Sequence, residues 1–246
     1  MGFSVPPTPV LVSWSSGKDS AWALHVLQQQ PDRYDVRGIF TTVTPHFDRV
    51  SIQATPRRVL AVQAERLGLP LYEIPIPYPC PNEAYEAAMR EFLELVRGLP
   101  PHLSAVTLAF GDLFLEDIRE YRVSRLAGSG FDAIFPIWGM PTSDLAQTML
   151  SSGLRAIVTA ISPTSRLDRS FAGRWFDQAF LDDLPDGTDP LGENGEFHTC
   201  VVDGPMLSRP ILAAPGEIVG RPVSRNHDGT GGTVTAWYAD VVLLED

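Results

Sequence analysis

Short apolar runs alternate with helical segments through the first 140 residues, and this alternation constrains the fold more than any other feature. Five runs rich in β-branched residues have the length of strands, and the segments between them repeat apolar residues at helical spacing. The predicted strands are residues 10–14, 36–43, 71–76, 105–110 and 132–137. Because parallel strands are usually joined by helices, we predict an α/β fold with a parallel sheet and helices on both faces.

Helix signals bound the segments between these strands. A first helical pattern runs to about Gln29, a second ends at Gly68, and a third begins at Asn82, a residue type that caps helices. The third helix carries its apolar side chains at core-facing spacing, and a fourth predicted helix spans residues 116–126. Each helix therefore supplies one crossover between strands.

The pattern changes after about Gly139. One more helix–strand unit, residues 143–162, precedes an aromatic segment that we interpret as a helix around Phe171, Trp175 and Phe176. An acidic stretch rich in glycine and proline follows at residues 182–195. We predict two domains, a sheet domain at residues 1–140 and a smaller α+β domain at residues 141–246.

Charge and composition exclude several classes of protein. The formal net charge of -11 disfavours nucleic acid and anionic membranes as partners. No apolar run approaches the roughly 18 residues of a membrane span, and two cysteines are too few for a disulfide framework, so we expect a cytoplasmic protein. The histidines lack the spacing of zinc ligands. Four of them are His25, His46, His102 and His227.

Residues 15–20, Ser-Ser-Gly-Lys-Asp-Ser, join the first predicted strand to the first predicted helix. Small residues let backbone N–H groups approach a ligand, the helix start offers unpaired donors, and Lys18 adds a positive charge. The loop therefore suits a phosphate, although its spacing is neither that of a Walker A loop nor that of a dinucleotide fingerprint. A simple helix cap with an incidental lysine is the alternative.

A second polar cluster occupies residues 192–199, where two glutamates, a histidine and a threonine stand beside two glycines. The glycines permit tight turns, and the polar groups can accept a proton, orient ammonia or hold a cationic substrate. Taken alone, the cluster also fits a polar hairpin loop. The candidate residues are Glu193, Gly195, Glu196, His198 and Thr199.

The two clusters together resemble a known family. The first resembles the S-G-G-x-D-S signature of the PP-loop ATP pyrophosphatases, with Ser16 at the first glycine, and we expect Ser16 to avoid a conformation that only glycine allows. The second, G-E-x-G-E followed by Thr199 and by Asp203-x-Pro205, is similar to the C-terminal signature of the diphthine–ammonia ligase family, a branch of that superfamily. The resemblance covers residues 10–211, and the W-S-S-G-K-D-S form is similar to bacterial-type members.

This resemblance implies a Rossmann-like sheet of the adenine nucleotide alpha hydrolase type. It also implies that ATP adenylates a carboxylate, that ammonia then displaces AMP, and that Mg²⁺ binds near Asp19. Catalytic roles are implied for Lys18, Asp19, Glu193 and Glu196. ATP contacts are implied for Ser13, Ser15, Ser16, Gly17, Lys18, Asp19, Ser20, Phe40, Thr41 and Gly111.

Acceptor contacts are implied for Asp112, Arg119, Glu193, Gly195, Glu196, His198 and Thr199. Asp112 also fits a helix cap, and Arg119 also fits a surface arginine. The family's substrate is the diphthine side chain of elongation factor 2, which bacteria lack, so a protein carboxylate and a small molecule both stay open as acceptors. We expect ammonia to be taken directly, without a glutaminase domain, and the chain to form a homodimer.

Two other functions stay open. Some PP-loop relatives thiolate tRNA, which would give Cys80 or Cys200 a role as a sulfur carrier. However, we interpret Cys80 as a loop residue between prolines and Cys200 as a buried strand residue, and no basic face for RNA is evident. The other function is a sensor that binds ATP or AMP without turnover.

Overall fold

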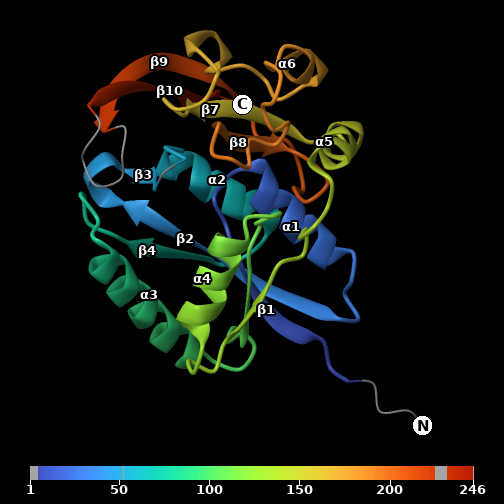
Figure 1. Cartoon of the computed structure of the whole chain (residues 1–246). Coiled ribbons are helices and arrows are strands. Elements are labelled where there is room, and N and C mark those ends of the chain that lie inside the picture. Colours follow the sequence, from blue (N-terminus) through green and yellow to red (C-terminus); the bar gives the residue numbers. More distant parts are fainter. Residues whose placement is uncertain (1–4, 52, 225–231, 246) are drawn as a thin grey trace.

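The strands of the first half of the chain form a six-stranded sheet in the computed structural model, which describes residues 5–51, 53–224 and 232–245 (Figure 1). β1 (Thr8–Ser13) lies between β2 (Tyr34–Thr44) and β5 (Thr107–Ala109). β4 (Leu71–Pro75) pairs with β2, and β6 (Asp132–Ile134) pairs with β5. All four pairings are parallel, as predicted.

One strand of this sheet was not expected. β3 (Arg49–Val50) pairs with β2 in the antiparallel direction. Two residues are too few to show the period of a strand, so the sequence carried no signal for it.

Helices cover both faces of the sheet, which confirms the predicted α/β class. They are α1 (Lys18–Gln28), α2 (Arg57–Leu67), α3 (Asn82–Arg97), α4 (Glu116–Leu126) and α5 (Thr142–Ser151). Val10 and Val12 of β1 pack in one core cluster with α1 and α5, whereas Leu11 packs in another with α3. This alternation follows from the period of two in a strand.

The predicted helix ends are largely correct. Gly68 ends α2 with a φ of +66°, the left-handed conformation that glycine adopts readily. Asn82, however, is the first residue of α3 and not its cap, because Pro81 occupies the preceding position and no side chain caps this helix.

The second half of the chain forms a separate four-stranded antiparallel sheet with the order β8-β7-β10-β9, drawn at the top of Figure 1. Its strands are β7 (Arg155–Ile161), β8 (Phe197–Asp203), β9 (Ala213–Ser224) and β10 (Thr233–Leu243). No strand is predicted from the sequence at β9 or β10. β9 contains prolines, which an edge strand tolerates, and a Cβ on its Gly220 would lie 2.7 Å from the Trp237 ring.

The predicted aromatic helix around Phe171, Trp175 and Phe176 is wrong. A 3₁₀ turn, Arg169–Phe171, is followed by an extended segment that pairs with β7, where the Phe176 amide donates to the Ala156 carbonyl at 2.8 Å. The helix α6 (Gln178–Asp182) begins only after this segment. The Phe171 and Phe176 rings pack against Phe180, whereas Trp175 packs against another core cluster, so the spacing of the three rings only resembled a helical pattern.

The two sheets share one hydrophobic core. A single cluster of buried side chains joins Val10 and Val12 of the first sheet to Val158, Phe197 and Val201 of the second. The domain boundary near residue 140 stays a prediction. Every helix in the described part of the chain is too short or too polar to span a bilayer.

Candidate functional site

The loop at residues 15–20, hereafter the 15–20 loop, lies at the point where the connections of the sheet diverge. β1 and β5 are neighbours, but α1 after β1 packs on one face and α4 after β5 contributes to the core of the other. In open α/β sheets, ligands bind at the carboxyl ends of strands at such a point. The 15–20 loop therefore has the position of a ligand-binding loop.

Serine hydroxyls close the 15–20 loop on itself. Ser20 Oγ donates to the Gly17 carbonyl at 2.9 Å and accepts from the Ser15 amide at 3.2 Å. The Ser15 and Ser20 hydroxyls also lie 3.0 Å apart. A Cβ on Gly17 would lie 3.1 Å from the Thr199 carbonyl oxygen, so the absence of a side chain lets the loop approach β8.

Ser16 adopts the conformation that we expected it to avoid. Its φ is +70°, in the left-handed region that non-glycine residues rarely enter. The Ser16 carbonyl accepts hydrogen bonds from the Val201 amide at 2.8 Å and from Gln63 Nε2 at 3.2 Å. These contacts from β8 and α2 hold the strained backbone, so the expectation was wrong for a tertiary reason.

Lys18 links the loop to the C-terminal sheet. Its side chain is almost fully buried, and Nζ donates to Asp19 Oδ2 at 2.9 Å and to the Leu191 carbonyl. Nζ also lies 5.3 Å from the centre of the Phe197 ring, a favourable position for a cation. Lys18 is the only lysine in the chain. The positive charge of the loop thus contacts both the loop itself, at Asp19, and Leu191, which lies more than 170 residues further along the sequence.

Asp19 keeps one carboxylate oxygen free. Oδ2 pairs with Lys18, whereas Oδ1 is buried and has no hydrogen-bond partner among the described residues. Burial raises the pKa of the Asp19 carboxyl, and the Lys18 charge opposes this rise. An oxygen of this kind can accept a ligand donor or a cation.

Asp189 organises the segment that contains the second cluster, hereafter the 192–199 segment. Asp189 Oδ1 accepts from the Leu191 amide at 2.8 Å and from the Glu193 amide at 3.3 Å. Its other oxygen accepts from the Thr142 hydroxyl at 2.7 Å. The aspartate therefore shapes the turn that leads to Gly192, and sequence reasoning missed it, although Asp before proline is a turn signal.

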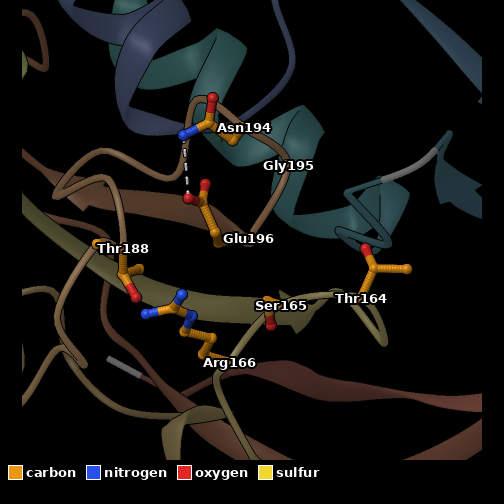
Figure 2. A pocket seen from close by; sticks show the side chains of 8 residues that line it. Thr164, Ser165, Arg166, Thr188, Asn194, Gly195 and Glu196 are labelled. Carbon is orange, nitrogen blue, oxygen red and sulfur yellow. Dashed lines mark hydrogen bonds between the residues drawn. The ribbon is translucent and has the colours of Figure 1, made fainter.

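Glu196 lies in the wall of a cavity of about 190 Å³ (Figure 2). Glu196 Oε1 accepts from the Asp189 amide at 3.1 Å and from Asn194 Nδ2 at 3.2 Å, while Oε2 is buried without a partner among the described residues. Figure 2 shows Arg166 and Thr188 in the same cavity wall. The cavity thus presents both a carboxylate and a guanidinium.

Glu193 and His198 are both uncharged at neutral pH. Burial, with the nearby Asp19 carboxylate, raises the pKa of Glu193 to about 8. Burial, with the Lys18 charge, lowers the pKa of His198 to about 4. Both groups lie close enough to Lys18 to feel its charge, and perturbed groups around one charge are typical of functional sites.

Thr199 joins the two clusters directly. The Lys18 amide donates to Thr199 Oγ1 at 3.1 Å, at the start of α1. The structure therefore brings together Gly17, Lys18 and Asp19 from the first cluster with Glu193 and Thr199 from the second.

Gly111, Asp112 and Arg119, which follow β5, have different partners in the structure. A Cβ on Gly111 would lie 2.8–2.9 Å from backbone atoms of Asp19 and Ser20, so a glycine lets the end of β5 approach α1. Asp112 forms a two-pronged ion pair with Arg122, at 2.5 and 3.1 Å. Arg119 lies over the Trp138 ring, 4.8 Å from its centre, and pairs with an exposed glutamate.

At the strand ends predicted to contact ATP, some groups already have partners within the protein. The Phe40 side chain is in the core against Phe92, and its carbonyl accepts from the Trp14 amide at 2.7 Å. Ser13 pairs with Phe40, and the neighbouring Thr41 is buried in β2. Their roles in binding stay predictions.

The two cysteines differ in burial. Cys200 is buried in β8, as predicted, and burial raises the pKa of its thiol to about 12. Cys80 lies in the loop before α3 and is partly exposed. Among the described residues, no three histidine, cysteine or acidic side chains gather in a metal-ligand arrangement, and His227 lies outside those residues.

Gln63 is the main residue of this region that sequence reasoning missed. It comes from α2, is fully buried, and contacts both the 15–20 loop and β8. The available signal was a glutamine among the apolar residues Leu60, Ala64 and Leu67 on one side of a helix.

Comparisons with known proteins relate the chain to enzymes of diphthamide synthesis. The model of a family described as the diphthamide synthase C-terminal domain matches residues 141–219. The chain is also 23% identical, over 187 residues, to diphthine–ammonia ligase from Bos taurus, covering 70% of this chain and 68% of the relative. Both matches support a relationship to the diphthine–ammonia ligases.

The matched family region contains the 192–199 segment, Asp189 and strands β7 and β8. It does not include the 15–20 loop. The second cluster thus lies within the matched range, and its contact with the first cluster is seen in the tertiary structure.

Proposed function

We propose that this protein is an ATP-dependent amide ligase that adenylates a carboxylate and transfers ammonia to it. It would be a bacterial-type relative of the diphthine–ammonia ligases, within the PP-loop superfamily. The observation that carries the proposal is the contact between the two clusters, through Lys18 with Leu191 and Thr199. The match of residues 141–219 and the bovine relative support the same reaction class.

The 15–20 loop suits the phosphates of ATP. It opens a helix at the carboxyl end of a central strand, where backbone N–H groups and the helix dipole favour anions. Ser16 Oγ and Asp19 Oδ1 are buried without partners among the described residues, so each has hydrogen-bonding capacity to spare. Mg²⁺ would bind at Asp19 and supply charge neutralisation for the phosphates.

The reaction would proceed in two balanced steps. A carboxylate oxygen of the acceptor attacks the α-phosphorus of ATP, the bond to the β-phosphate oxygen breaks, and pyrophosphate leaves. Ammonia then attacks the acyl carbon, AMP leaves, and one proton is released. The proton would pass to solvent at neutral pH, where Glu193 is protonated, and Glu193 would accept it once the pH approaches its pKa of about 8 and the carboxylate forms.

The 192–199 segment would form the acceptor site of a C-terminal domain at residues 141–246, next to an ATP-binding domain at residues 1–140. Glu196 and Thr199 would position the acceptor, while the Asp112–Arg122 pair borders the site near Glu193. The acceptor would be a small molecule or a protein side chain. A net charge of -11 disfavours a large polyanion in this role.

Pyrophosphate exchange tests the first step without ammonia. Purified protein, Mg²⁺, ATP and radiolabelled pyrophosphate are incubated with a panel of carboxylates, and label entering ATP reports reversible adenylation. We expect exchange with at least one carboxylate, AMP formation once ammonium is added, and loss of both in Lys18→Met. Asp186→Asn, a change on an exposed turn, is the control. Release of ADP in place of AMP would contradict the mechanism.

A further inference from the structure

Gln63 is a buried polar side chain of α2 whose amide oxygen and nitrogen both form hydrogen bonds, to residues 14–16 and to β8. Oε1 accepts from Trp14 Nε1 at 3.0 Å, just before the 15–20 loop. Nε2 donates to the Val201 carbonyl at 2.7 Å and to the Ser16 carbonyl at 3.2 Å. A side chain with no exposed surface that bridges three segments fixes their relative positions.

The contact with Ser16 falls where the loop is strained. A serine at a φ of +70° is held there only by its surroundings, and the carbonyl of this residue accepts two hydrogen bonds, from Gln63 and from Val201. Without them, an extended backbone at Ser16 would be favoured, and the amides at the start of α1 would change direction. Gln63 therefore contributes to the shape of the loop from outside it.

The same amide group also holds β8. Val201 lies two residues after Thr199, whose hydroxyl accepts from the Lys18 amide. The 15–20 loop and the strand that continues the 192–199 segment are consequently connected at Ser16 and at Lys18.

We propose that Gln63 is a positioning residue that joins the nucleotide loop to the acceptor strand β8, so that one side chain sets the geometry of both. The inference rests on the proposed function, because it assigns ATP to the 15–20 loop. Gln63 touches no reacting atom and acts through the Ser16 and Val201 carbonyls. Loss of its amide releases the loop and lowers the affinity for ATP.

Two substitutions separate this role from simple packing. Gln63→Met keeps the volume and removes every hydrogen bond. Gln63→Glu keeps an acceptor for Trp14, but its carboxylate faces the Ser16 and Val201 carbonyls, and only its protonated form can donate to them. Cys200→Ala is the matched control, because Cys200 Sγ accepts a weak hydrogen bond from the same Nε2 at 3.7 Å and is not a partner through which Gln63 reaches the loop.

The experiment measures the dissociation constant of ATP with Mg²⁺ by calorimetry, with thermal melting to verify folding. We expect at least tenfold weaker binding in Gln63→Met and less than a twofold change in Cys200→Ala. The affinity of Gln63→Glu relative to wild type rises as the pH falls from about 8 to about 6, since burial raises the pKa of a carboxyl. Equal affinity in wild type and Gln63→Met would overturn the inference.

Hydrogen exchange of the loop amides gives a readout that does not depend on ATP. Faster exchange at residues 14–18 in Gln63→Met than in Cys200→Ala supports the positioning role, and unchanged exchange overturns it. If wild type binds no ATP while the exchange result holds, the proposed function fails and the loop-to-strand connection stands. If Gln63→Met is too unstable for calorimetry, hydrogen exchange in Gln63→Glu at the two pH values decides the question. Exchange at residues 14–18, relative to wild type, that is slower at the lower pH supports the inference, and a ratio that does not change with pH overturns it.

Discussion

The 15–20 loop and the 192–199 segment are both short, polar and glycine-containing, yet their conformations have different origins. The left-handed residue in the first is Ser16, at a φ of +70°, held by contacts from α2 and β8. In the second, Gly192 and Gly195 adopt φ values of +69° and +80°. The first conformation is imposed by distant elements, and the second follows from the residue types of the segment.

The two segments also differ in charge. The 15–20 loop carries a formed ion pair between Lys18 and Asp19. The 192–199 segment keeps Glu193 and His198 uncharged at neutral pH, because burial raises the pKa of the first to about 8 and lowers that of the second to about 4. Substitutions at the contact between them should therefore have the largest effects, and substitutions within one segment smaller ones.

Lys18→Met removes the side chain that joins the two segments. It leaves the partly buried Asp19 carboxylate and the Leu191 carbonyl without their partner. Breaking a buried pair from one side costs about 3–5 kcal/mol, and we expect a loss of that size with loss of ATP binding. Chemical denaturation and calorimetry measure the two effects, with the exposed Arg209→Met as control. A stable variant that still binds ATP would show that the segments hold their positions independently.

Gly111→Ala tests close packing against conformational freedom. A Cβ there would lie 2.8–2.9 Å from backbone atoms of Asp19 and Ser20, so we expect a destabilisation of about 1–3 kcal/mol and a displaced loop. Gly195 provides the contrast, because a Cβ there meets nothing within 4 Å and its strain comes only from φ. Asparagine, which tolerates this region, should be accepted at 195 but not at 111. Equal losses at both positions would remove the distinction.

Glu193→Gln tests whether the shifted pKa of Glu193 makes the stability of the protein depend on pH. Because the folded pKa of about 8 exceeds the ordinary 4.5, the folded wild type binds more protons than the unfolded chain between these values. Wild-type stability therefore falls as the pH rises from about 4.5 to about 8, and levels off above.

Glu193→Gln should not show this fall in stability, because glutamine does not titrate. The melting temperature of the variant should match wild type near pH 4.5 and exceed it by at least about 2–4 °C near pH 9, the shift that roughly 1 kcal/mol gives for a chain of this length. Melting curves across pH, with Asp186→Asn in parallel, measure the difference. A constant difference at all pH values would mean that Glu193 titrates normally.

Ser16→Gly should have the smallest effect. Relief of the left-handed strain gains about 1–2 kcal/mol, and the greater freedom of an unfolded glycine costs about 0.5–1 kcal/mol. We expect a net stabilisation of about 0.5–1 kcal/mol, measured by denaturation. Ser16→Ala keeps the strain and should show no gain. Destabilisation by glycine would indicate that the Ser16 hydroxyl has a structural partner.

Local patterns predicted the parallel sheet well and the antiparallel sheet poorly. Strands β1, β2 and β5 are largely buried inside the sheet, and β4 and β6 carry apolar side chains that pack partly buried against the core, so each appears as an apolar run. β9 is an edge strand with prolines and with glycines that pack under Trp237 and beside Val242, features that become understandable only with its partner β10 in place. The helix predicted around Phe171 was wrong for the same reason, because the spacing of its aromatic residues reflects packing against Phe180 in the folded protein.

At the candidate site, local sequence is enough to predict that residues 15–20 join a strand to a helix, because this depends only on neighbours in the chain. Only the tertiary structure decided that Lys18 reaches Leu191, that Ser16 is held in a left-handed conformation, and that Gln63 touches both partners. The shifted pKa values of Glu193 and His198 belong to the same class. Burial and proximity produce them, and both arise from segments that meet only when the two sheets pack together.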